Sequence, residues 1–336
     1  MSMTFNSKVG SKKEQGYPCD LCGSHNVQII WDKVLREELG VLNSAVVKDE
    51  EGNMIHGRIV MCENCGLIFT DPKLTELDLI KFYQEEYRTI YNHGDDMLRH
   101  MQTEANHANT AFQIMQRYID TEALNQSEDR LNYADIGAST LRACTGFKAV
   151  FKDKARVVAI EPSKEYIQAG LDLNKKNNMD GQIEIFNGMI SAFKPNYKLD
   201  FVTMLNTLEH MHSPAKVLQH LYSIMDEGAI MVISVPTIFG ISPMLSVDAW
   251  LSNAHLYHFA PPTISMLLVK TGFQPIEMIG QMEEIGEKMY IVAQKTQPQD
   301  IVIDKTPNYG LVRQYLLEQD AVNLTRFAMI NGGYYK

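Results

Sequence analysis

Short apolar runs alternate with helical patterns through the middle of the chain. Five of these runs have the length of a buried strand, and they lie at Leu131–Ile136, Val157–Ile160, Ile183–Phe186, Phe201–Leu205 and Ile230–Val235. Strands that alternate with helices predict a parallel sheet with helices packed on it. Two later runs, Phe273–Ile279 and Met289–Ala293, bring the expected sheet to about seven strands.

Several helices carry recognisable end signals. Ser213 can cap a helix that begins at Pro214 and is expected to end at Gly228. Another helix is expected to end at Lys270, before Gly272. Apolar residues at helical spacing also predict helices upstream of the sheet, between residues 75 and 124.

The chain of 336 residues is long enough for about two domains. The composition shifts predict a flexible polar lead over 1–16, a cysteine-bearing domain over 17–74 and a helical bridge over 75–125. An α/β domain is expected over 126–297, followed by a helical extension over 298–336 that could support a homodimer.

Charge and hydropathy narrow the class of protein. Lys and Arg number 31 against 41 Asp and Glu, which gives a formal charge of −10, so no overall positive field favours nucleic acid or anionic lipid. Apolar runs such as Ala229–Val235 are far shorter than a membrane helix requires, and the first sixteen residues contain no apolar core of a signal peptide. We therefore expect a cytoplasmic protein.

The cysteines form two C-x-x-C pairs, Cys19 with Cys22 and Cys62 with Cys65, and a glycine follows each pair. Four thiolates at such spacing are typical of a closed tetrahedral zinc site, which would be structural. The long segment between the pairs, Trp31–Ile59, would then be an insert. The alternatives are a redox dithiol or plain buried cysteines.

A second set of residues predicts a nucleoside site. The strand at Leu131–Ile136 runs into a turn of small residues ending at Ser139, where backbone N–H groups can approach a ligand. Glu161 follows the next strand, at the position where a carboxylate usually binds ribose hydroxyls. The alternative is an ordinary turn with a surface glutamate.

These residues resemble a known family. The resemblance to class I S-adenosylmethionine-dependent methyltransferases rests on Asp135–Ser139, Glu161–Ser163, Asn187–Gly188, Asn206–His210 and Leu256–Phe259. The cysteine pairs and Met61–Pro72 are similar to a zinc-ribbon branch that contains sugar methyltransferases. The resemblance spans Cys19–Lys295 and implies a seven-stranded Rossmann-like sheet in the order 3-2-1-4-5-7-6, with the last strand antiparallel.

The resemblance also implies roles for particular residues in binding S-adenosylmethionine. Asp135, Gly137, Ala138 and Ser139 would line its methionine side, and Glu161 with Pro162 would lie at the ribose. Gly188, Met189 and Ile190 would border the adenine, and Leu205 and Asn206 would face the sulfonium and the acceptor. Tyr87 would close over the cofactor.

This chain departs from the family pattern at three positions. Ser139 and Leu141 stand where the family has glycines, and Leu141 is expected to narrow the room for the methionine tail. Met189 replaces an acidic residue that contacts the adenine amine, so adenine recognition would rest on backbone groups.

Methyl transfer needs a protein base only when the acceptor carries a proton. His255, Tyr257 and His258 lie in one loop expected beside the cofactor, and we expect one of the two histidines to be the base. Glu209 follows the fourth strand and either shares this chemistry or bonds a neighbouring backbone group. If neither histidine acts, the enzyme would methylate nitrogen or rely on positioning alone.

The leading hypothesis is methylation of a small metabolite, such as a sugar or nucleotide-linked sugar. One alternative is an RNA methyltransferase that grips RNA with the zinc ribbon. Another is a catalytically degenerate scaffold. A dehydrogenase is disfavoured because its phosphate-binding loop would need glycines at Ser139 and Arg142.

Overall fold

The computed structural model describes residues 16–33, 58–73, 75–81, 83, 97–179, 181–241, 246–251, 254–283, 286–303 and 308–331. The expected lead, apart from Gly16, and the expected cofactor-closing Tyr87 lie outside the described residues.

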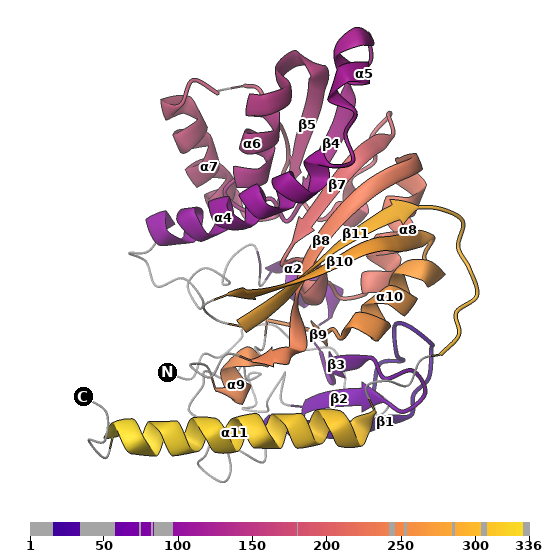
Figure 1. Cartoon of the computed structure of the whole chain (residues 1–336), viewed down its shortest axis with the longest axis vertical. Coiled ribbons are helices and arrows are strands. Elements are labelled where there is room, and N and C mark those ends of the chain that lie inside the picture. Colours follow the sequence, from indigo (N-terminus) through magenta and orange to yellow (C-terminus); the bar gives the residue numbers. More distant parts are fainter. Residues whose placement is uncertain are drawn as a thin grey trace.

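The predicted seven-stranded sheet is present (Figure 1). Its strands are β4 (Leu131–Ile136), β5 (Ala155–Ile160), β6 (Glu184–Phe186), β7 (Leu199–Leu205), β8 (Met225–Ile241), β10 (Phe273–Glu283) and β11 (Gly286–Lys295). They follow the order β10-β11-β8-β7-β4-β5-β6, which is 3-2-1-4-5-7-6 read from the other edge. β11 is antiparallel to both neighbours, and the pairs from β6 to β8 are parallel. The expected α/β fold is therefore confirmed.

Helices cover both faces of this sheet (Figure 1). One face carries α4 (Met97–Gln116), α6 (Arg142–Phe151) and α7 (Lys164–Lys176), and the other carries α8 (Pro214–Ile224) and α10 (Pro261–Lys270). Two short helices, α2 (Glu76–Lys81) and α5 (Thr121–Gln126), lie on either side of α4 in the sequence. Single 3-10 turns occur at Lys152–Lys154 (η2), Ile190–Ala192 (η3) and Leu208–His210 (η4). The apolar stripes predicted from sequence thus become the contacts between helices and sheet.

Some of the helix boundaries predicted from the sequence are confirmed and one is wrong. Ser213 caps α8 as expected, since its hydroxyl accepts a hydrogen bond from the backbone N–H of Lys216. The prediction that Gly228 ends α8 is wrong, because the chain has already entered β8 at Met225. Gly272 follows α10 with a φ of +94°, in the left-handed region that favours glycine.

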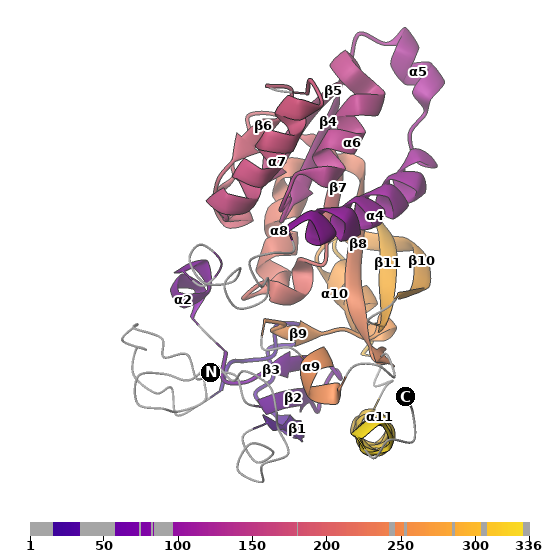
Figure 2. The ribbon, with the colours of Figure 1, turned by 90° about the vertical axis from the view of Figure 1, so that its left-hand side faces the viewer.

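A second sheet combines three strands from the N-terminal region with one strand that lies far along the chain. It consists of β1 (Val27–Asp32), β2 (Arg58–Cys62), β3 (Ile68–Thr70) and β9 (Tyr257–His258), in that order. The two ends of the predicted insert pair with each other as β1 and β2, while residues 34–57 lie outside the described part of the chain. Figure 2 shows β9 beside β3, at the edge of the small sheet that lies toward the large one.

One apolar core joins the two sheets. The same cluster of buried side chains contains Cys19, Leu67 and Phe69 from the cysteine-bearing region and Ile136 and Tyr257 from the α/β region. The short helix α9 (Val247–Trp250) and the long helix α11 (Tyr309–Asn331) pack against the small sheet through a further cluster. None of the helices in the described residues is both long and apolar enough to cross a membrane.

Candidate functional site

A cavity of about 680 Å³ opens at the C-terminal ends of β4, β5 and β7. This is the edge where open parallel sheets bind ligands. All residues predicted to hold the cofactor line the cavity: Asp135, Gly137, Ala138, Ser139, Glu161, Pro162, Gly188, Met189, Leu205 and Asn206. Ile190, also expected at the adenine, lines it as well. The fold thus gathers residues from separate segments at one place.

The turn after β4 has the left-handed backbone conformation of a glycine-rich loop, although only one of the three left-handed residues is a glycine. Gly137, Ser139 and Leu141 have φ values of +72°, +43° and +66°. A Cβ at position 137 would lie 2.5 Å from Thr207 Oγ1, so glycine is required there. Ser139 and Leu141 instead accept a strain of roughly 1–2 kcal/mol each. The Leu141 side chain is fully buried and does not line the cavity, so the prediction that it narrows the cofactor site is wrong.

Glu161 places a buried carboxylate at the end of β5. Its Oε2 accepts the backbone N–H of Ser139 at 2.9 Å, and its Oε1 accepts that of Ser163 at 2.8 Å. Burial raises the pKa of Glu161 to about 7, although these two backbone hydrogen bonds oppose the shift. Burial also raises the pKa of the neighbouring Asp135 to about 7, against a hydrogen bond from Thr203 Oγ1. Both carboxyls can therefore ionise when a positively charged or hydroxyl-donating ligand arrives.

Helix α4 contributes side chains that we did not predict from the sequence. His100 Nε2 lies 3.1 Å from Glu104 Oε1 and 3.2 Å from Ser139 Oγ, and its ring stacks on Tyr166. Burial pushes the Glu104 pKa upward, but hydrogen bonds such as that from His100 outweigh it and the pKa is lowered. One turn further, His107 Nε2 accepts from Lys288 Nζ at 2.8 Å. The spacing of positions 100, 104 and 107 puts them on one helical face, a signal present in the sequence.

Glu209, His210 and His255 form a polar cluster in the wall of the same cavity. One donor atom from each lies within 4.8 Å of the others. Both carboxylate oxygens of Glu209 are buried without a hydrogen-bond partner among the described residues, and burial raises its pKa to about 8. His210 Nδ1 donates to the carbonyl oxygen of Ala254 at 2.8 Å, which leaves the lone pair on Nε2. Burial lowers the pKa of His210 to about 4 and that of His255 well below its ordinary value.

The residues expected to be catalytic divide into two groups. Glu209 and His255 line the cavity, whereas Tyr257 and His258 do not. The Tyr257 hydroxyl donates to the carbonyl oxygen of His212 at 3.2 Å and accepts from Lys73 Nζ at 2.6 Å. His258 is buried in β9, where burial lowers its pKa to about 3. The side chains of β9 are thus packed inside the protein, behind the cavity wall.

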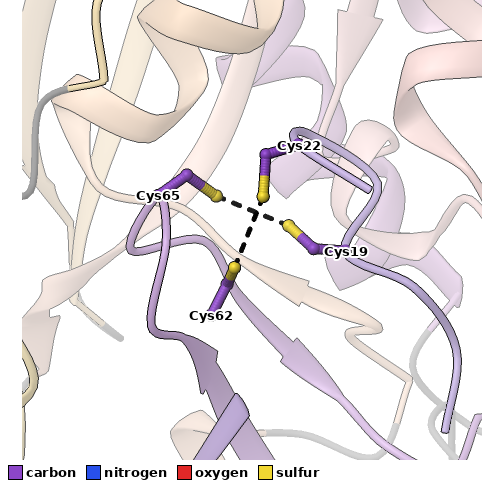
Figure 3. A group of neighbouring side chains, drawn as sticks. All are labelled: Cys19, Cys22, Cys62 and Cys65. Carbon is purple, nitrogen blue, oxygen red and sulfur yellow. Dashed lines mark hydrogen bonds between the residues drawn. The ribbon is translucent and has the colours of Figure 1, made fainter. Parts of the chain in front are cut away.

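The two cysteine pairs converge on one point, although their positions are far apart in the sequence (Figure 3). Cys19 Sγ lies 3.4 Å from Cys65 Sγ, and Cys22 Sγ lies 3.5 Å from Cys62 Sγ. Each pair ends in the same turn, in which Gly23 or Gly66 has a φ of +76° and its N–H bonds the carbonyl of the first cysteine. Four sulfurs at about 2.3 Å around a zinc ion lie roughly 3.8 Å apart, so this donor set fits tetrahedral zinc.

The α/β region of the chain matches the model of a known protein family. Residues 100–278, more than half of the chain, match the family described as "Methyltransferase domain". The chain belongs to this family. The methyltransferase domain thus runs from α4, through the cavity-lining strand ends, into β10. No curated protein matches the chain.

Solved structures of methyltransferases are similar in fold to this chain. The 1,6-didemethyltoxoflavin-N1-methyltransferase of Burkholderia thailandensis, solved with 1,6-didemethyltoxoflavin and S-adenosylhomocysteine, is 16% identical. It has a TM-score of 0.51, and the match covers 69% of this chain and 96% of that one. The magnesium protoporphyrin IX methyltransferase of Synechocystis, solved with S-adenosylhomocysteine, is 14% identical with a TM-score of 0.48, covering 66% and 100%.

Proposed function

We propose that the protein transfers a methyl group from S-adenosylmethionine to a small-molecule acceptor, a sugar or nucleotide-linked sugar. The observation that carries the proposal is one cavity lined by two chemically different sets of side chains. Glu161 and Asp135 present buried carboxyls beside the turn after β4, and Glu209 and His255 come from other segments of the chain and line the same cavity. A methyltransferase needs a donor site and an acceptor site that meet, and the two sets of side chains in one cavity support this proposal.

The donor half suits a nucleoside linked to an amino acid. Glu161 would accept the ribose hydroxyls, Asp135 and the turn ending at Ser139 would lie along the methionine portion, and Met189 would border the adenine. S-adenosylmethionine, when bound, supplies an electrophilic methyl on a sulfonium. Leu205 ends β7, Asn206 follows it, and both line the cavity, where they would face the methyl group and the acceptor atom.

The acceptor half suits an oxygen or carbon atom that must lose a proton. Nδ1 of His255 is buried without a hydrogen-bond partner among the described residues, and burial keeps the ring neutral. We propose that His255 takes the acceptor proton and that the ionised Glu209 stabilises the resulting imidazolium. Tyr257 and His258 would position this segment from behind, since neither lines the cavity.

The cysteine set would hold one structural zinc ion on Cys19, Cys22, Cys62 and Cys65. Cys19, Cys62 and Cys65 are buried against the methyltransferase core. This burial argues against the cysteine cluster as a separate RNA-binding surface. A cytoplasmic location and a homodimer through α11 stay predictions.

Binding and turnover test the proposal together. S-adenosylhomocysteine should bind the purified protein in calorimetry, and labelled methyl from S-adenosylmethionine should pass to a member of a panel of sugars and nucleotide sugars. Absence of binding at millimolar concentration would support the scaffold alternative. Transfer to RNA in preference to small acceptors, with steep salt dependence, would support the RNA alternative.

A further inference from the structure

We infer that the cysteine module, residues 16–33 and 58–73, holds the acceptor side of the active site in place, with Thr70 and Asp20 as positioning residues. This inference rests on the proposed function, because it assigns the module a part in that reaction. The module contributes no side chain to the cavity wall within the described residues. Its effect must therefore pass through the segments that it contacts.

The first contact is the pairing of β3 with β9. Ile68 pairs with His258 and Phe69 with Tyr257 in antiparallel register. The pairing continues as the backbone N–H of Thr70 donates to Leu256 O at 2.9 Å, and Thr70 Oγ1 donates to His255 O at 3.1 Å. The main chain of His255, the proposed base, is thus fixed by a residue of the cysteine module.

The same segment is tied to Glu209. The backbone N–H of Leu256 donates to Glu209 O at 2.8 Å, next to the carbonyl groups that Thr70 contacts. The two side chains proposed for proton transfer therefore come from segments that are bonded to each other, and one of them is bonded to β3. A shift of β3 would move His255 relative to Glu209.

The second contact is made by Asp20, which lies inside the first cysteine pair. Its Oδ1 accepts from Ser213 Oγ at 2.5 Å, and its Oδ2 accepts from the backbone N–H of Ala215 at 2.7 Å. Asp20 thus adds a second cap to the N-terminus of α8, where a carboxylate is favoured by the helix dipole. Ser213 itself lines the cavity, and η4 with Glu209 lies shortly before it in the sequence.

Lys73 completes this connection. Its ammonium group donates to His212 O at 2.8 Å and to the Tyr257 hydroxyl at 2.6 Å. The segment from Glu209 to Ser213 is consequently held by the module at two places. The donor half depends on other elements, since its residues come from α4 and from the segments that follow β4, β5 and β6.

This difference between the two halves gives a direct test at Thr70. Thr70→Val removes the hydroxyl bond to His255 O with little change of volume, Thr70→Ser restores a hydroxyl, and Thr271→Val is a matched control. Thr271 is also buried, and its hydroxyl donates to backbone carbonyls at the end of α10, away from the cavity.

We expect Thr70→Val to lower kcat by about tenfold or more, because small displacements of a catalytic group carry costs of that size. The dissociation constant for S-adenosylhomocysteine should stay within about twofold, and Thr70→Ser should recover most of the turnover. Thr271→Val should lower the melting temperature while leaving kcat unchanged. Unchanged kcat in Thr70→Val, or equal losses of donor affinity and kcat, would overturn the inference.

A second experiment needs no turnover and so separates this inference from the proposed function. Amide hydrogen exchange is measured over residues 209–216 and 254–259 in the full-length protein, in Asp20→Asn and in Asp120→Asn. Asp120 also caps a helix, accepting the backbone N–H groups of Glu122 and Ala123 at the start of α5. Asp20→Asn should raise exchange in these two segments by about tenfold, while exchange in β4 and β5 stays unchanged.

Asp120→Asn should leave both segments as they are in the wild type. If exchange in the two segments does not change in Asp20→Asn, Asp20 does not hold the acceptor side and the inference fails. If exchange rises as expected but the wild type neither binds S-adenosylhomocysteine nor transfers methyl, the proposed function fails while the mechanical role of the module stands.

Discussion

Replacing Glu161 with glutamine tests the donor site through its pH dependence. The carboxyl has a pKa of about 7 because it is buried, so near neutral pH it is divided between its two forms. Only the ionised form can accept two ribose hydroxyls with a charged group. If binding requires that form, protonation multiplies the apparent Kd by about 11 at pH 6 and by about 1.1 at pH 8. Affinity should therefore fall about tenfold as the pH decreases across that range.

The variant adds a loss that does not depend on pH. The glutamine side chain would have one acceptor oxygen for the two backbone donors, Ser139 and Ser163, that Glu161 now satisfies. It would also lose the charge facing the ribose. Together these changes should weaken binding of S-adenosylhomocysteine at pH 8 by about 1–3 kcal/mol, or roughly 5- to 150-fold.

Isothermal calorimetry with S-adenosylhomocysteine at three pH values measures both effects. The raised pKa has the opposite sign for folding, because the unfolded state ionises first. Stability from this carboxyl should thus fall as the pH rises from its ordinary pKa of 4.5 to about 7. Asp135 titrates in the same range, so the variant should keep a shallower slope. A wild-type Kd that does not change with pH, together with an unchanged Kd in Glu161→Gln, would refute this account of the donor site.

Four further outcomes are expected. Elemental analysis of chelator-washed protein should find one zinc per chain, and Cys62→Ser should lose it and unfold the cysteine module first in limited proteolysis. His255→Ala should lower kcat on the identified acceptor by roughly 10²- to 10⁴-fold with donor affinity unchanged. His258→Ala should mainly lower the melting temperature. A large loss of kcat in His258→Ala and none in His255→Ala would instead make His258 the base. In the wild type kcat should rise with pH through about 8 as Glu209 ionises, and Glu209→Gln should remove that limb from the pH profile. Leu141→Gly should lower the free energy of unfolding measured in urea, because the lost side chain costs about 2–5 kcal/mol and the relieved backbone strain returns only about 1–2 kcal/mol, and it should not tighten donor binding.

Much of the large sheet could be predicted because its physical causes are local. β4 was predicted with its observed bounds. β5 contains the predicted run Val157–Ile160, which is continuously apolar because that part of the strand is buried on both faces. The residues expected at the cofactor follow the ends of parallel strands, and such ends meet at one edge whatever the rest of the chain does. The cavity therefore contains them all.

The parts that could not be predicted depend on contacts between distant segments. β9 has only two residues, too few for a period to be visible, and it becomes a strand because β3 pairs with it. For the same reason the sequence could not distinguish His255 from His258. In the structure His255 lines the cavity and His258 is buried in β9, and this difference follows from the pairing of β9 with β3. The place of His100 and His107 in the cavity wall could not be predicted, because nothing local indicates that α4 lies over the strand ends.

The pairing of β3 with β9 has a consequence for how the protein is made. Thr70 and His255 are 185 positions apart, so the N-terminal strands leave the ribosome long before their partner strand is synthesised. At about 5–20 residues per second the interval is roughly 10–40 s. During that time the edge of β3 has no β9 to pair with. A metal ion bound by the four cysteines during synthesis would keep those strands ordered until β9 has been made. A fragment that ends before residue 255 would expose the unpaired edge of β3, which would be prone to aggregation.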